Sequence, residues 1–137
     1  MNRHARSLVL PGLLALAVLL LGACSGAPAA TPSPTASPVD YDAEAQAAAD
    51  LLDQALAAYI AGDSQAAMDL VADAYEQHFE LIEHPLEEID EAFMEELEVL
   101  IATRIRAAMT DGAPASTVQL LVEEAKAGLA QAQEMLE

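Results

Sequence analysis

Basic side chains are nearly absent from most of this 137-residue sequence. The chain has 23 Asp and Glu against five Lys and Arg, and every acidic residue comes after position 24. The basic residues in that part are Arg104, Arg106 and Lys126, so its formal charge is −20. Binding to a phosphate backbone needs basic side chains, and we therefore expect no nucleic-acid partner. Cations, basic peptides or a basic protein surface are the expected partners.

Cysteine, tryptophan and the common catalytic motifs are also scarce or missing. With a single cysteine the chain has no internal disulfide framework, so its stability must come from packing. The sequence contains no GxGxxG, Walker A, CxxC or GxSxG motif, and no pairing of a nucleophile with a base is visible. We therefore predict that the protein is not an enzyme.

An uncharged leader precedes the single cysteine. Basic residues near the start, among them Arg3 and Arg6, are followed by residues 7–23, which are rich in Leu, Val and Ala. This order is typical of an export signal. The run is shorter than the roughly 20 apolar residues of a spanning helix and is interrupted by Pro11. An uncleaved signal anchor is the alternative interpretation.

Cys24 follows Leu21, Gly22 and Ala23, and this tetrapeptide resembles the lipobox of bacterial lipoproteins. The resemblance implies that residues 1–23 are removed and that Cys24 carries lipid. Each buried methylene contributes about 0.8 kcal/mol, so such an anchor would hold the chain stably on a membrane. We therefore expect a location in the cell envelope, facing the periplasm or the extracellular side.

A linker and one helical domain are expected after the lipidated cysteine. Residues 24–39 are uncharged, with four prolines, which predicts a semi-extended linker of polyproline character. Residues 40–137 are rich in Ala, Leu and Glu, which favours helix. Their apolar periodicity predicts an all-α domain, an antiparallel four-helix up-down bundle. The expected helices are 42–61, 63–83, 86 or 90 to 110, and one capped by Ser116 or Thr117.

Two signals set the expected ends of the second helix. Gly62 and Asp63 read as a helix stop followed by an N-cap. Pro85 disfavours a helical conformation at His84, so we expect the chain to break or kink there.

Carboxylates recur at helical spacing in two rows. The first row, Asp69, Asp73, Glu76, Glu80 and Glu83, falls within about 80° on an ideal helix. A second row comprises Glu88, Glu91, Glu95 and Glu98. A solvated acidic face accounts for such rows in an acidic protein. Alternatively, the rows converge near Pro85 and attract iron, manganese, calcium or magnesium. The candidate metal ligands are Asp73, Glu76, Glu80, Glu83, His84, Glu87 and Glu98.

Residues 45–110 resemble the soluble helical domain that precedes the membrane part of bacterial Ftr-type iron permeases. The shared pattern is A-x-Y-x-x-G-D, then D-A-Y-x-x-x-F-E-x-x-E. The matching positions include Tyr59, Gly62, Asp63, Asp73, Tyr75, Phe79, Glu80 and Glu83. The resemblance implies an extracytoplasmic module of iron uptake, with Asp73, Glu80 and Glu83 at the acidic positions. The chain lacks the R-E-x-x-E motif of the permease membrane part, so transport and ferroxidase activity are not carried over.

Two functions follow from these observations. The first is a membrane-anchored lipoprotein that binds iron or another divalent cation as an accessory of metal uptake, beside an envelope iron transporter. The second is a non-catalytic scaffold or interaction lipoprotein whose acidic face binds a basic protein partner.

Overall fold

The computed structural model describes residues 38–137, which belong to one compact unit. All regular structure in this range is helical, so the predicted all-α class is confirmed. The expected leader, Cys24 and all but the last two residues of the expected linker lie outside the described residues. Within 38–137, no helix combines the length and the apolar composition needed to cross a membrane.

The described backbone forms three continuous helical runs. Short non-helical loops separate the runs at residues 61–63 and 111–114, and two segments of the middle run, η1 and η2, are π-helices. The first run is α1 (Tyr41–Ile60), the middle run comprises α2 (Ser64–Asp73), η1 (Ala74–Phe79), α3 (Glu80–Glu98), η2 (Val99–Ile105) and α4 (Arg106–Thr110), and the last run is α5 (Ala115–Leu136).

The loop between α1 and α2 has the predicted chemistry. Gly62 adopts a φ of +88°, a conformation that glycine tolerates without strain. The Asp63 N–H donates to the Ala58 carbonyl at 3.0 Å, which closes the end of α1. The Asp63 side chain then accepts from the Ala66 N–H at 3.0 Å and begins α2. The stop and the N-cap expected at Gly62 and Asp63 are therefore confirmed.

The start of α5 differs from the prediction. The helix begins at Ala115, preceded by Pro114 with ψ of 140°, and no side chain caps it. The Pro114 carbonyl instead accepts from the Thr117 N–H at 2.8 Å. Proline is favoured beside a helix start because its fixed φ suits the first turn. A cap by Ser116 or Thr117 is therefore wrong.

The bend of the middle run lies at Asp90 rather than at Pro85. Pro85 sits inside α3, whereas Asp90 has non-helical angles of φ −152° and ψ 90°. The expected break at Pro85 and His84 is therefore wrong. Ile82 and Leu86 are fully buried on either side of Pro85, and their burial holds that turn in place. Asp90 accepts from the Phe93 N–H at 3.1 Å, so its side chain restarts the helix after the bend.

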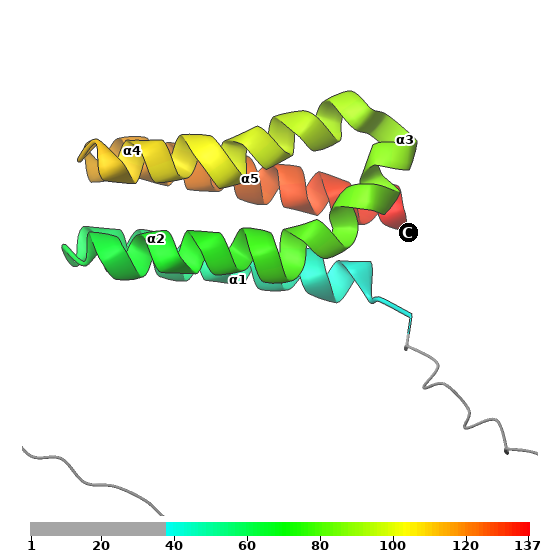
Figure 1. Ribbon diagram of the computed structural model, residues 1–137, viewed down its shortest axis with the longest axis horizontal. Helices are drawn as coiled ribbons and strands as arrows, with labels where there is room; N and C mark the ends of the chain where they lie inside the picture. Colours follow the sequence, from blue (N-terminus) through cyan, green and yellow to red (C-terminus); the bar gives the residue numbers. More distant parts are fainter. Residues whose placement is uncertain (1–37) are drawn as a thin grey trace, which may run out of the picture. The chain divides into compact units, whose positions relative to one another are not determined.

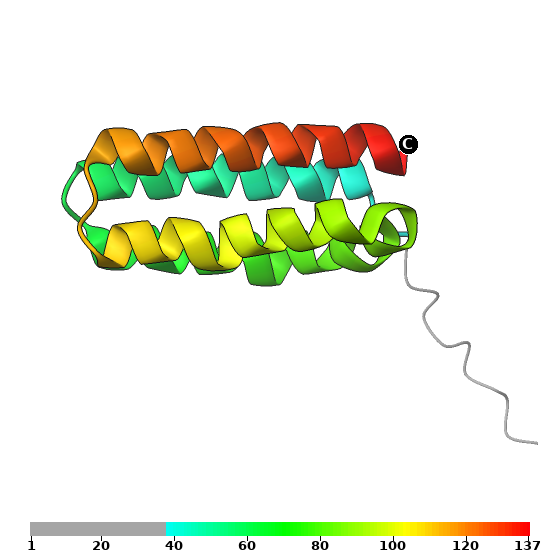
Figure 2. The same cartoon turned by 90° about the horizontal axis from the view of Figure 1, so that it is seen from above.

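Helices pack around a core of small and branched side chains. Figure 1 shows the middle run folding back within α3, at the end of the domain where α1 begins and α5 ends. Figure 2 shows α1 and α5 lying side by side along their length, in agreement with their contacts. The buried residues of these two helices include several alanines, among them Ala48, Ala55, Ala125 and Ala132. Small side chains let these two helices approach closely.

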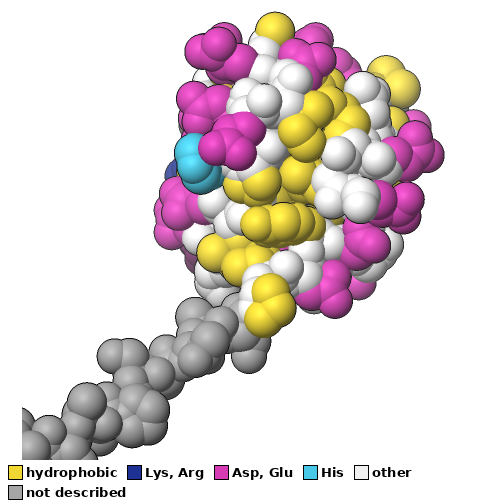
Figure 3. Space-filling model, turned by 90° about the vertical axis from the view of Figure 1, so that its right-hand side faces the viewer, with side chains coloured by type: hydrophobic (Ala, Val, Ile, Leu, Met, Phe, Trp, Pro, Cys, Tyr) yellow, Lys and Arg dark blue, Asp and Glu magenta, His cyan; other side chains and the backbone are white. Residues whose placement is uncertain are grey.

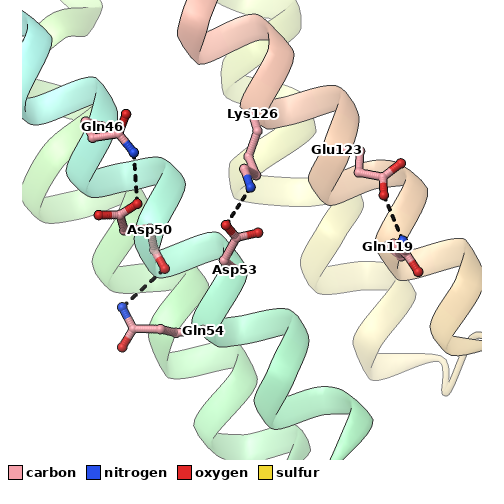
Figure 4. Close-up of polar contacts among 7 residues, drawn as sticks. All are labelled: Gln46, Asp50, Asp53, Gln54, Gln119, Glu123 and Lys126. Carbon is pink, nitrogen blue, oxygen red and sulfur yellow. Dashed lines mark hydrogen bonds and ion pairs between the residues drawn. The ribbon is translucent and has the colours of Figure 1, made fainter.

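Polar contacts lie on the exposed surface of α1 and α5, both between the two helices and within each of them. Lys126 on α5 forms an ion pair with Asp53 on α1, and the same view shows exposed bonds within each helix (Figure 4). One of these is the bond from Gln46 to Asp50 at 2.8 Å. Exposed pairs of this kind each contribute only about 0–1 kcal/mol, so the core carries most of the stability.

The end of the domain at which α3 bends carries apolar surface. Figure 3 shows a band of apolar side chains across this end, with carboxylates on both sides. Large exposed apolar residues of the described range include Val39, just before α1, and Ile89, just before the bend, which is 53% exposed.

Candidate functional site

The π-helix η1 changes the position of the first acidic row relative to the core. The buried residues of this stretch are Ala67, Val71, Ala74, Phe79, Ile82 and Leu86. Their spacing is 4, 3, 5, 3 and 4, and the step of five spans η1. The acidic row keeps an unbroken spacing of 4, 3, 4 and 3 across the same stretch. An ideal α-helix, for which the row falls within about 80°, does not contain this extra residue.

The extra residue shifts the register between the acidic row and the core. Asp69, Asp73 and Glu76 each follow a buried residue by two positions, whereas Glu80 and Glu83 follow one by a single position. Of the two later carboxylates, Glu83 is half-buried beside the core and Glu80 is exposed. Asp73, which directly precedes the buried Ala74, is half-buried as well.

Tyr75 lies at the centre of the carboxylates that the structure brings together. Its phenol donates to Glu98 Oε1 at 3.3 Å. Burial, together with the charges of Glu83, Glu98 and Glu80, raises the pKa of Tyr75 to about 12. We call Tyr75, Glu80, Glu83, Glu87 and Glu98 the Tyr75 cluster.

The surroundings of Glu83 disturb its ionisation. Burial raises the pKa of Glu83, and the neighbouring charges of Glu98, Glu80 and Glu87 raise it further. The Lys and Arg ion pairs found in residues 38–137 involve Glu124 and Asp53, not the cluster. A concentration of negative charge without a basic partner favours protons or cations.

Backbone geometry positions the tyrosine. The Glu80 N–H bonds to the Tyr75 carbonyl, a five-residue spacing that places the two residues one π-helical turn apart. The Tyr75 ring stacks on Phe79 with centroids 5.8 Å apart and 28° between the planes. Because Phe79 is fully buried, this contact fixes the ring beside the core. Glu98 reaches it from the other side of the bend in α3.

Other predicted ligands lie outside this arrangement or at its edge. Asp73 accepts from the Gln77 side chain at 2.7 Å, and Glu76 is exposed on η1. The His84 side chain is 79% exposed, with Nδ1 at 3.6 Å from Glu87 and Nε2 at 3.7 Å from Glu88. His84 therefore belongs to an exposed row on α3 that touches the cluster only through Glu87.

Two features of the structure have no visible signal in the sequence. The place of Tyr75 among the carboxylates depends on a π-helical turn, which leaves no mark in a sequence. His78 is half-buried, with Nδ1 at 2.7 Å from Glu44 Oε2 on α1. The two partners are 34 residues apart, and no local pattern pairs them.

The side chains of the Tyr75 cluster do not form a ready-made metal site in the described residues. Within residues 38–137, no three His, Asp or Glu side chains are placed so that they could together hold a metal ion. What the cluster offers is a half-buried carboxyl of raised pKa, a phenol and further carboxylates at the surface. Such groups take up protons or attract cations, whereas a nucleophile paired with a base is not among them.

Comparisons with known proteins were made at three levels. Neither the protein-family models, nor the curated proteins, nor the solved structures contain a match to this chain.

Proposed function

We propose that this chain is an extracytoplasmic lipoprotein that binds iron or another divalent cation as an accessory of metal uptake. Lipid on Cys24 would anchor it in the cell envelope, near an iron transporter. In this proposal the parts of the middle run before and after the bend at Asp90 count as separate helices, and the domain is an antiparallel four-helix up-down bundle. The protein has no catalytic role.

The observation that carries the proposal is the Tyr75 cluster. Like charges and burial raise the pKa of Glu83, so a cation at this position would relieve a repulsion that the folded chain maintains. Carboxylate and phenol oxygens are hard donors suited to iron, manganese, calcium or magnesium. The resemblance to the soluble domain of Ftr-type permeases, in which Glu80 and Glu83 occupy acidic positions, favours iron among these.

Binding would require side-chain movement. Glu83 would rotate toward Tyr75 and Glu98, which are already hydrogen-bonded to each other. Ordering each glutamate side chain costs up to about 2 kcal/mol of rotamer entropy. We therefore expect moderate affinity, suited to capture and release rather than to permanent storage.

Calorimetric titration of the full chain with Fe²⁺ (under anaerobic conditions), Mn²⁺, Ca²⁺ and Mg²⁺ tests the proposal. We expect binding tighter than millimolar that is lost in a Glu80→Gln/Glu83→Gln variant. A Glu91→Gln/Glu95→Gln variant removes the same charge from exposed positions and should bind like the unmodified chain. Binding weaker than millimolar, or an equal effect of the two variants, would reject the proposal.

Proton release gives an independent measurement. Because the pKa of Glu83 is raised, cation binding at mildly acidic pH should displace part of a proton from this group. The apparent binding enthalpy should then differ between two buffers of unequal ionisation enthalpy, and the difference should vanish in Glu83→Gln.

A further inference from the structure

A groove of about 320 Å³ lies between α5 and the part of the middle run that follows the bend at Asp90. Its lining includes Phe93, Leu97 and Leu100 on one side and Ala127 and Gly128 on the other. Large side chains thus face the smallest ones, and this difference in size leaves the space open.

Gly128 lets the Leu97 side chain pack closely against α5 at the floor of the groove. A Cβ atom at this position would lie 2.7 Å from Leu97 Cδ1, so any larger residue would displace the Leu97 side chain. Glycine inside a helix is about 1 kcal/mol less favourable than alanine. Here its absent side chain gives Leu97 a buried position beneath the opening, where it is 3% exposed.

Carboxylates stand on both walls of the groove. Glu96 is exposed on α3 and Glu124 on α5, and both belong to the lining. Arg104 approaches Glu124 at 3.3 Å, whereas Glu96 has no Lys or Arg ion pair among the described residues. The rim therefore carries net negative charge around an apolar floor.

We propose that this groove binds a short amphipathic helical segment of a partner protein, with two apolar side chains one turn apart and Lys or Arg on both flanks. Residues 93–100 extend over about 10 Å, roughly two helical turns, which matches apolar anchors four residues apart. Glu96 then faces a basic residue on one side of the segment, and on the other side a basic residue shares Glu124 with Arg104.

Charge disfavours the other occupants. The part of the chain after position 24 carries a formal charge of −20, so a second copy and an anionic lipid surface are both repelled. Glu98 faces Tyr75 on η1 rather than α5, so the groove is separate from the Tyr75 cluster. Loss of cation binding and loss of peptide binding are therefore distinguishable.

A synthetic helical peptide tests the inference. The probe carries two leucines four residues apart with lysines on both sides, and it is added to the ¹⁵N-labelled full chain in zwitterionic detergent. We expect amide shifts concentrated in residues 93–100 and 124–131. A peptide with glutamate in place of lysine, and a scrambled peptide with the leucines on opposite faces, should cause no such shifts.

Matched variants distinguish peptide binding in the groove from non-specific attraction of the peptide to the acidic surface. Ala127→Leu fills the groove and should weaken binding of the lysine peptide at least about tenfold, a loss of about 1.4 kcal/mol. Ala130→Leu adds the same side chain to an exposed site outside the lining and should leave affinity within about twofold. Glu96→Gln should weaken binding by about twofold to fivefold, and its exposed neighbour variant Glu95→Gln should not.

Three results would overturn the inference. One is equal binding by Ala127→Leu and Ala130→Leu. Another is a spread of shifts over the whole acidic surface. The third is a change in the shifts of residues 93–100 with protein concentration alone, which would identify a second copy as the occupant.

Discussion

At the scale of single residues, burial and the negative charge of nearby carboxylates change the ionisation of neighbouring side chains. Tyr75 and Glu83 keep their protons more strongly than usual because burial and nearby carboxylates disfavour their charged forms. The effect has a definite sign. A group with a raised pKa in the folded state contributes stability at low pH and loses that contribution as the pH rises through its folded pKa.

Glu83 should therefore make the folded chain less stable as it ionises. We expect Glu83→Gln to raise the free energy of unfolding more at pH 7 than at pH 4, because the native carboxyl carries more charge at the higher pH. Urea unfolding at both values measures this difference. The exposed Glu91→Gln is the matched control. A loss of stability at pH 7 in Glu83→Gln would contradict the raised pKa.

The contact between His78 and Glu44 joins η1 to α1 through half-buried side chains. We expect a coupling free energy of about 0.5–1.5 kcal/mol from a double-mutant cycle with His78→Ala and Glu44→Ala, measured by urea unfolding. The exposed pair Gln46 and Asp50, four residues apart on α1, should give about 0.5 kcal/mol or less. Equal coupling free energies in the two cycles would show that partial burial does not strengthen the contact between His78 and Glu44.

At the scale of elements, α3 contains both a proline within a helical turn and a bend five residues later. Pro85 has no N–H to offer the Leu81 carbonyl, which weakens that turn. Asp90 provides a new N-cap, and the bend falls where a side chain can satisfy the free backbone.

Replacing Pro85 should stabilise the chain. Alanine restores the missing N–H and removes the ring clash, so we expect Pro85→Ala to raise the free energy of unfolding by about 1–3 kcal/mol. Chemical denaturation gives the value. Pro114→Ala, at the start of α5, should give no comparable increase, because that N–H has no partner within the helix. No gain in Pro85→Ala would mean that the turn is already fully relaxed.

Local chemistry explains which elements were predictable. Gly62 and Asp63 act within a few residues, and the helix stop and N-cap expected there were predicted correctly. The site depended on less visible geometry. The sequence identified the carboxylates Glu80, Glu83 and Glu98, but not Tyr75, because the π-helical turn that positions Tyr75 has no local sequence signal.

At the scale of the whole molecule, packing of small residues opposes strong self-repulsion. The part of the chain after position 24 has 23 acidic and three basic residues. Such an imbalance keeps a protein soluble but destabilises its compact state.

Salt should therefore stabilise the fold. Raising sodium chloride from about 0.01 M to about 1 M shortens the Debye length from roughly 30 Å to roughly 3 Å and screens the repulsion. We expect Tm to rise across this series when unfolding is followed by circular dichroism. Sucrose at matched osmolality should produce a smaller rise. A Tm that falls as salt is added would show that attractive pairs such as Lys126 and Asp53 dominate.

The step of five between Ala74 and Phe79 also bears on how such a chain changes during evolution. Removing one residue within η1, for example Gln77, would restore an unbroken 3 and 4 spacing of buried positions. We expect such a deletion to keep its helical circular dichroism and to leave Glu80 and Glu83 one position after the buried Phe79 and Ile82. The 4, 3, 4 and 3 spacing of the acidic row would be broken instead. A single inserted codon therefore changes the register between a row of carboxylates and the core beneath it.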